Sequence, residues 1–338
     1  MKVPLLWSLF FAASLLASCS DSEPAKKSGA FKIAVIPKGT AHEFWKAVEQ
    51  GARKADDEFE DLTIVWKGPS GEGDAPAQIA LVESFIADGV DGICLAPLDA
   101  RALEKPVRAA AAAKIPVVIF DSGLASADAP IASFVATDNY KGGEMAGAEL
   151  AEALKGEGKV ILLRYVLGSE STEQREKGFL DAIAKHPKIE VLSSDKHGGP
   201  TEADAVAVSE TLLSNFGEKV NGVFCSNESA TSGFLTALAR DSRGLGGKVI
   251  VVGFDSSKKI EDALATGALR ATVIQDPTRM GYLAVVAMHT RLTGGTPKAR
   301  IDTGERLIHF PDLPLVDKVD ELRTLGYTDR KTDREKER

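Results

Sequence analysis

The chain has 338 residues, of which 44% are hydrophobic and 27% are charged, a composition typical of soluble globular proteins. This length is enough for two domains of ordinary size. The net charge is −8 and no basic block lies inside the folded region, which argues against a nucleic-acid partner, because such a partner requires a concentrated cationic face.

The N-terminus is predicted to be a targeting segment. Lys2 is the only charge before an apolar run at residues 4–17, which has the length of a signal-peptide core and is short for a membrane span. The run ends in LASC at Cys19, which resembles the lipobox of bacterial lipoproteins, where the cysteine is acylated. The alternative is a plain secretory signal that contains a cysteine. We predict a lipoprotein signal peptide over residues 1–18, lipidation of Cys19 and a polar, flexible tether over residues 19–30.

Short apolar runs recur along the rest of the chain, and each ends in polar or turn-forming residues. The runs are Ile33–Ile36, Asp61–Trp66, Gly92–Ala96, Val117–Phe120, Val160–Leu163, Ile189–Leu192, Val223–Cys225, Val249–Val252 and Ala271–Ile274. Such runs indicate strands buried on both faces, and the helical patterns between them imply right-handed βαβ units and parallel sheets. The strand that ends at Ile274 is the last clear one, and a helix is predicted over Pro277–Leu292.

Polar side chains stand at the carboxyl ends of several of these predicted strands. Asp121, Asn227, Asp255 and Gln275 are examples. Taken alone, Asp255 after VVGF is more typical of an aspartate that caps a turn than of a ligand contact. Ligands of parallel sheets gather outside the carboxyl ends of the strands, so the recurrence of the pattern favours a binding site there.

The two remaining cysteines, Cys94 and Cys225, each lie in a predicted strand. Export would permit a disulfide. The two strands belong to different predicted domains, however, and a bridge would lock any hinge between them. We therefore expect two buried free thiols. No CxxC or Cys/His spacing indicates a zinc site, and neither a metal nor a cofactor is expected.

Three short sequence motifs, in the order in which they occur, resemble those of a known protein family. FCSNES at Asn227, VVGFD at Asp255 and VIQDP at Gln275 together resemble the periplasmic sugar-binding proteins of the ribose-binding type, which are type I solute receptors of ABC importers related to LacI-type ligand-binding cores. The resemblance runs from about Phe31 to about Arg306. It implies an α/β fold of two similar Rossmann-like lobes, each a parallel sheet flanked by helices, joined by three crossing segments with the ligand between them.

The resemblance also implies where the boundaries between the two lobes lie. The implied crossing segments are Val135–Asp138, Gln275–Pro277 and Asp302–Gly304. The implied N-terminal lobe comprises residues 31–137 and 276–303, and the C-terminal lobe comprises residues 138–275 and 304–327. Residues 328–338, which carry both charge signs and no apolar side chain, are expected to form a fraying tail.

Seven ligand contacts are implied, position by position: His42, Phe44, Trp45, Asp121, Asn227, Asp255 and Gln275. Trp45 is expected to stack on the ligand, whereas for Phe44 a core position stays open, and for His42 a solvated loop position stays open. Carboxylates accept hydrogen bonds from sugar hydroxyls, amides both donate and accept, and aromatic rings cover the apolar faces of a sugar. A polar site of this kind rejects analogues that leave its groups unpaired.

One stretch departs from the family. In STEQREKGF the position that usually holds an arginine is Glu173, and Arg175 lies two residues on. The two would point about 200° apart on a helix, so that one of them faces the cleft. Ser122, after the first-lobe acid, replaces a second frequent arginine. The loss of both arginines argues against ribose itself. It leaves acidic side chains near the ligand with less positive charge opposite them: Asp121 and Asp255, with Glu173 and Glu228 as further candidates. A plain sugar is expected, and a cyclitol or an amine-bearing sugar is the alternative.

These expectations describe a monomeric, lipid-anchored, extracytoplasmic protein, in the periplasm or on the cell surface, that captures a sugar and delivers it to an ABC permease. The alternative within the family is a sugar or small-signal receptor coupled to a membrane sensor. A transcriptional regulator would need a helix-turn-helix where the signal segment stands. A glycosidase would need paired catalytic carboxylates, and no nucleophile-and-base set, GxSxG or P-loop is present, so an enzyme is not expected.

Overall fold

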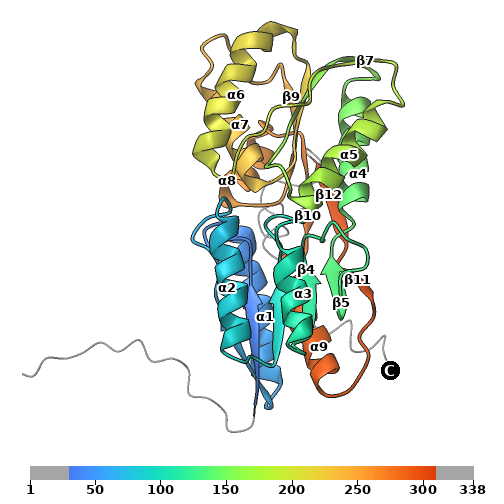
Figure 1. Cartoon of the computed structure of the whole chain (residues 1–338). Helices are drawn as coiled ribbons and strands as arrows, with labels where there is room; N and C mark the ends of the chain where they lie inside the picture. The colour runs from blue at the N-terminus through green and yellow to red at the C-terminus, as the bar shows by residue number, and fades with distance from the viewer. Residues whose placement is uncertain (1–29, 310–338) are drawn as a thin grey trace, which may run out of the picture.

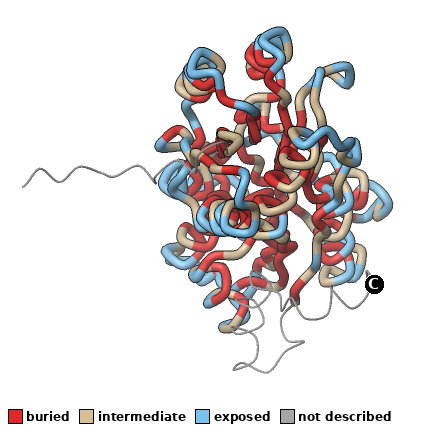
Figure 2. Tube along the Cα trace, turned by 90° about the horizontal axis from the view of Figure 1, so that it is seen from below, coloured by how far each residue is buried: buried red, intermediate tan, exposed pale blue. Residues whose placement is uncertain are grey.

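A computed structural model describes residues 30–309 of the chain. The predicted lipidation at Cys19, the tether and the charged tail lie outside these residues. Two lobes are stacked end to end, and each is a six-stranded sheet with helices on both faces (Figure 1). Viewed along the long axis, buried residues concentrate in the interior and exposed residues at the periphery (Figure 2).

The first lobe is built on a parallel sheet with the strand order β11-β5-β4-β3-β1-β2. Its strands are β1 (Phe31–Ile36), β2 (Leu62–Trp66), β3 (Gly92–Leu95), β4 (Val117–Phe120), β5 (Ser133–Ala136) and β11 (Arg300–Asp302). Its helices are α1 (Glu43–Glu58), α2 (Ala75–Ala87), α3 (Glu104–Ala112) and α9 (Pro277–Leu292). Helices α1 and α9 share one apolar core with the sheet, and α2 and α3 share the other.

Most of the second lobe precedes helix α9 in sequence, but α9 packs on the first lobe, against α1 (Figure 1). Glycines make this close approach possible. A Cβ at Gly281 would lie 2.0 Å from the backbone oxygen of Val48, and one at Gly51 would lie 1.8 Å from that of Thr278. The two helix backbones are therefore nearly in contact, which fixes α9 on the first lobe.

The second lobe is built on a sheet with the order β12-β10-β9-β8-β6-β7, parallel except for the antiparallel pair β10 and β12. Its strands are β6 (Glu157–Leu163), β7 (Lys188–Ser193), β8 (Gly222–Cys225), β9 (Ile250–Phe254), β10 (Ala271–Gln275) and β12 (Glu305–His309). Its helices are α4 (Asn139–Ala153), α5 (Glu170–Ile183), α6 (Glu202–Phe216), α7 (Glu228–Arg240) and α8 (Lys258–Thr266), with a 3₁₀ turn at Gly217–Lys219.

The predicted fold class is confirmed, with two corrections to the elements. Val135 belongs to β5, which pairs with β4 and β11, so that the first passage between lobes is limited to residues 137–138. The strands β11 and β12 were not predicted, because they are short or half-exposed edge strands without a continuous apolar run. The chain passes between the lobes after β5, β10 and β11. The exact domain boundaries stay a prediction.

Cys94 and Cys225 are free and buried, as expected. Burial in an apolar strand raises the pKa of both thiols, which keeps them protonated and unreactive. Within residues 30–309, no helix combines the length and apolarity that crossing a membrane would require.

Candidate ligand-binding site

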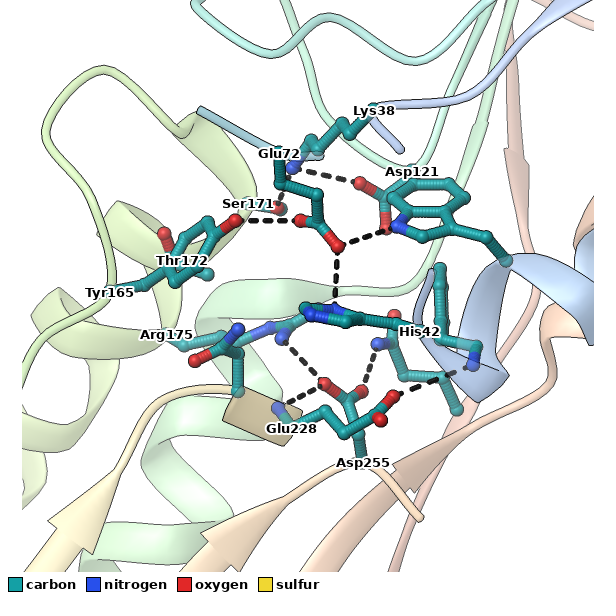
Figure 3. A pocket seen from close by; sticks show the side chains of 14 residues that line it. Lys38, His42, Glu72, Asp121, Tyr165, Ser171, Thr172, Arg175, Glu228 and Asp255 are labelled. Atoms are coloured by element: carbon teal, nitrogen blue, oxygen red, sulfur yellow. Dashed lines mark hydrogen bonds and ion pairs between the residues drawn. The ribbon is translucent and has the colours of Figure 1, made fainter. Parts of the chain in front are cut away.

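A polar pocket lies between the two lobes (Figure 3). First-lobe residues that line it are Lys38, His42, Phe44, Trp45, Glu72 and Asp121. Second-lobe residues that line it are Tyr165, Ser171, Thr172, Arg175, Asn227, Glu228, Asp255 and Gln275. Eight of the nine predicted ligand-binding residues are therefore brought together in one place.

Two aspartates occupy matching positions in the two lobes. Asp121 directly follows β4, and Asp255 directly follows β9. Both have positive φ angles, of 62° and 71°, in the left-handed region that aspartate tolerates better than most residues. The left-handed turn ends each strand abruptly and leaves the carboxylate at the edge of the sheet that faces the other lobe.

Asp121 is paired with Lys38, a residue that the sequence analysis did not select. Lys38 Nζ lies 3.0 Å from Asp121 Oδ2, and both side chains are 4% exposed. The same ammonium donates to the hydroxyls of Ser171, at 3.0 Å, and Ser169, at 3.2 Å. A first-lobe ion pair is thus hydrogen-bonded to the second lobe.

Glu72 is the centre of a second network. Its carboxylate accepts hydrogen bonds from Trp45 Nε1 at 2.7 Å and from the Tyr165 hydroxyl at 2.7 Å, and it pairs with His42 Nδ1 at 2.6 Å. The His42 side chain reaches into the middle of the pocket, below Glu72 in Figure 3. With 18% exposure, it is not a solvated loop residue.

Burial alone would lower the pKa of His42, but the hydrogen bond and charge of Glu72, aided by the charges of Glu228 and Asp255, raise it from 6.5 to about 9. Burial alone would also raise the pKa of Glu72. The hydrogen bond and charge of His42 outweigh it and hold the pKa below its ordinary value. At neutral pH the pair is therefore an imidazolium and a carboxylate.

Arg175 is the third positively charged side chain of the pocket, after Lys38 and His42. Its guanidinium stacks on the Phe254 ring, 3.8 Å from the centroid, and donates to Asn139 Oδ1 at 2.8 Å and to the backbone oxygen of Ser226 at 3.1 Å. Nη1 also lies 3.7 Å from Asp255 Oδ2. These contacts from several directions fix the plane of the guanidinium beside the aspartate.

Asp255 accepts hydrogen bonds from Gln275 Nε2 at 2.6 Å and from the backbone N–H of Glu228 at 3.0 Å. Burial raises the pKa of Asp255, although Arg175 and Gln275 oppose the shift. Gln275 is 8% exposed, and its Oε1 is buried without a hydrogen-bond partner among the described residues. A buried carbonyl oxygen of this kind is a ready acceptor for a ligand hydroxyl.

The neighbouring residues Asn227 and Glu228 differ in role. Asn227 lines the pocket, but it also caps α7, because its Oδ1 accepts from the backbone N–H of Ala230 at 3.2 Å. Glu228 Oε2 lies 3.5 Å from the backbone N–H of Phe44 in the other lobe. Burial raises the pKa of Glu228 to about 7, although the charge of His42 opposes the shift.

The two aromatic residues both reach the pocket. Trp45 is 3% exposed, belongs to the first-lobe core, and contacts Phe44 edge-on with ring centroids 4.9 Å apart. Phe44 is half-buried and packs against the same core. Stacking of Trp45 on a ligand stays a prediction, while its indole N–H is committed to Glu72.

The structure decides between Glu173 and Arg175. Glu173 is exposed and its Oε1 accepts from the backbone N–H of Gly168 at 2.8 Å, so it lies outside the pocket lining. Arg175 faces the cleft on the opposite side of α5. We expected that the cleft would lack both arginines of the family. This expectation is wrong for one of them, because α5 directs Arg175 into the pocket.

Five lining residues were missed by sequence reasoning: Lys38, Glu72, Tyr165, Ser171 and Thr172. Lys38 and Tyr165 each stand two residues after a strand, the same distance as Asn227, so the strand-end rule could have found them. Glu72 lies in a glycine-rich loop with no periodic signal. Among residues 30–309, no group of His, Cys, Asp and Glu side chains is arranged to hold a metal ion.

Comparisons with known proteins point to one family. A profile for the periplasmic binding protein domain matches residues 33–296. The D-ribose/D-allose-binding protein of Pseudomonas aeruginosa is 31% identical over 302 residues, which cover 86% of this chain and 93% of that protein.

Solved structures agree with this match. A carbohydrate transporter solute binding protein from Agrobacterium radiobacter, in complex with D-arabinose, has a TM-score of 0.81 and 33% identity, covering 87% of this chain and 99% of that chain. The periplasmic component of an ABC-type sugar transport system from Hahella chejuensis has a TM-score of 0.78 and 34% identity, covering 82% and 99%. Both similarities extend over nearly the whole described region.

Proposed function

The chain belongs to the periplasmic binding protein domain family, and on that premise we propose that it captures an uncharged sugar between its two lobes for import by an ABC transporter. The observation that carries this function is the interlobe pocket in which Asp121 and Asp255 end matching strands of the two lobes. A ligand that contacts both aspartates favours the closed arrangement, because it gains affinity only when the lobes approach each other.

The charge balance of the pocket supports an uncharged ligand. Three carboxylates each have a cation within 4 Å, in the pairs Lys38–Asp121, His42–Glu72 and Arg175–Asp255. Burial raises the pKa of Glu228 to about 7, so the charge of this lining residue changes near neutral pH. A polyhydroxylated ligand supplies donors to the unpaired Oε1 of Gln275 and acceptors to the fixed guanidinium of Arg175 without adding charge.

Calorimetric titration tests this function directly. The panel is D-ribose, D-allose, D-arabinose, D-glucose, myo-inositol and D-glucosamine, which separates ring size, stereochemistry, cyclitol and amine. We expect at least one neutral member to bind with micromolar or tighter affinity. Failure of every neutral member to bind at millimolar concentration would overturn the function, and binding of D-glucosamine alone would replace the uncharged ligand by an amine-bearing one.

Anchoring and delivery complete the proposed function. Acylation at Cys19 would hold the protein at a membrane surface outside the cytoplasm, and the sugar-loaded monomer would hand its cargo to an ABC permease. The motif at Cys19 supports the anchor. Mass spectrometry of the mature protein should find acylated Cys19 as the first residue, and an unmodified N-terminus at another position would refute the anchor.

A further inference from the structure

One buried carboxylate, that of Glu72, joins both lobes and two candidate sugar contacts (Figure 3). Its donors are Trp45 Nε1 and His42 Nδ1 from the start of α1, and the Tyr165 hydroxyl from the segment after β6 in the second lobe. All three donor–acceptor distances lie between 2.6 and 2.7 Å. Each is the length of a strong, charge-assisted hydrogen bond.

The surrounding backbone makes room for this carboxylate. A Cβ at Gly39 would lie 2.8 Å from Glu72 Cγ, so that a residue with a side chain at this position would push Glu72 away from its donors. The donors themselves are buried, with Trp45 3% and Tyr165 1% exposed. In this arrangement Glu72 is the partner of both the indole N–H and the hydroxyl, and loss of a buried donor's partner is costly.

We propose that Glu72 is a positioning residue of the sugar site, which orients His42 and Trp45 toward the ligand and latches the lobes together through Tyr165. The proposal rests on the function proposed above for the part that concerns sugar. The orienting bonds to His42 and Trp45 lie within the first lobe and persist when the lobes separate. The bond to Tyr165 forms only when the lobes close, so it adds to the closed state a contact that is independent of ligand identity.

The electrostatic surroundings of His42 support the orienting role. The acids that raise its pKa to about 9 are Glu72, Glu228 on α7 and Asp255 after β9, and the cations Lys38 and Arg175 line the same pocket. Of these groups, only Glu72 is hydrogen-bonded to the imidazole. With Glu72 replaced by a neutral isostere, the hydrogen bond and the charge that chiefly oppose burial are lost, so the pKa of His42 should fall.

The first test follows the His42 ring by NMR in the sugar-free protein, with the signal assigned by its disappearance in His42→Gln. The parent should titrate near pH 9, and Glu72→Gln should bring the midpoint to the ordinary 6.5 or below. A midpoint that stays near 9 in Glu72→Gln would overturn the orienting role. Should Glu72→Gln fail to fold, the latch is tested independently by Tyr165→Phe, which removes one oxygen atom.

The second test measures the distance between spin labels at Ser84→Cys on α2 and Ser214→Cys on α6, two exposed serines in different lobes. In Figure 1 the helices α2 and α6 lie on the same side of the molecule, one in each lobe. Cys94 and Cys225 are buried and do not interfere. In the sugar-free protein, Tyr165→Phe should shift the distribution toward longer distances. A distribution identical to that of the parent would overturn the latch.

Tyr140→Phe is the matched control. It removes a hydroxyl that donates to Asp181 at 2.8 Å, between α4 and α5 of a single lobe, and should leave the distance distribution unchanged. A shift of equal size in this control would show that the effect is general loosening and would refute the latch.

Sugar titrations separate the latch from the proposed function. Every panel sugar that binds the parent should bind Tyr165→Phe about tenfold more weakly, by a similar factor for each. A loss that depends on the sugar would make Tyr165 a direct ligand contact and overturn the latch. If no sugar binds the parent, the proposed function fails, whereas the two sugar-free measurements still decide the role of Glu72.

Discussion

Asp255 offers the sharpest test of the sugar site, because two substitutions at this position separate shape from charge. Asp255→Ala removes the acceptor of Gln275 Nε2 and of the Glu228 backbone N–H, and with them the acceptor proposed for a ligand hydroxyl. Asp255→Asn keeps one acceptor for the Glu228 N–H. Its amide N–H₂ then faces Gln275, which can turn its side-chain amide over and offer the Oε1 that has no partner in the described residues.

The magnitudes follow from these contacts. A hydrogen bond to a charged group is worth roughly 1.5–3 kcal/mol, so Asp255→Ala should weaken sugar binding by about ten- to a hundredfold. Removal of one partner of a buried ion pair costs about 3–5 kcal/mol of stability. The 3.7 Å separation from Arg175 places Asp255→Ala at the low end of that range. Asp255→Asn should lose less than tenfold in affinity for a neutral sugar, and about as much as Asp255→Ala for an amine-bearing one.

The assay is calorimetry with the tightest sugar of the panel, combined with urea unfolding of each variant. Asp128→Asn is a suitable control, because this aspartate pairs with Arg108 on the surface and its side chain is 79% exposed. The control should match the parent in both measurements. An Asp255→Ala variant that binds as tightly as the parent would show that the site has been assigned to the wrong end of the second-lobe sheet.

Three further outcomes follow from the structure. Arg175→Ala should weaken sugar binding about ten- to a hundredfold and Glu173→Ala less than twofold by calorimetry, and equal effects would contradict the orientation of α5. Burial raises the pKa of Glu228 from 4.5 to about 7, so the folded state binds a proton that the unfolded state releases. The parent should therefore lose up to about 3 kcal/mol more unfolding free energy than Glu228→Gln as pH rises from 4.5 to 7, while the raised pKa of Asp255 contributes to both, and urea unfolding across that range measures the difference. Gly281→Ala should lower the free energy of unfolding by about 1–3 kcal/mol or more because its Cβ meets the backbone of α1, whereas Gly246→Ala, which has open space around it, should be neutral in thermal unfolding.

The sheets could be predicted from the sequence to the extent that their strands are buried on both faces. Every residue of β3 and β4 is buried, so each gives a continuous apolar run, and the turn-forming residues around it favour a strand over a helix. β11 has no buried residue and β12 has one, so their sequences carry no such signal. Their positions depend on pairing with β5 and β10, and such long-range pairing cannot be deduced from the local sequence.

The residues of the candidate site also fall into those that the sequence could predict and those that it could not. Asp121 and Asp255 were found because they stand directly at strand ends, and a parallel sheet brings such ends to one edge. Glu72 was missed because the loop before α2 has no periodicity, and its position depends on three donors from distant segments. The orientation of Arg175 depends on the rotation of α5 about its axis, which the packing of α4 against α5 fixes. Gly143 and Gly178 hold these two helices so close that an added Cβ at either would lie 2.0 Å from a backbone oxygen of the other helix.

The distribution of charge in the cleft explains how such a polar interface can open. The ion pairs lie within single lobes: Lys38–Asp121 and His42–Glu72 in the first, and Arg175–Asp255 in the second. The bonds that cross between the lobes each include at least one neutral group, as in Tyr165 to Glu72, Gly123 N–H to Glu170 at 2.8 Å, or Ser171 N–H to Ser122 at 3.0 Å. Separating the lobes therefore leaves every one of these three pairs intact and exposes to water only groups that water can satisfy. Breaking a buried ion pair would cost several kcal/mol, whereas exchanging a hydrogen bond for one to water costs about 1–3 kcal/mol, so this arrangement keeps opening and closing within reach of the binding energy of one sugar.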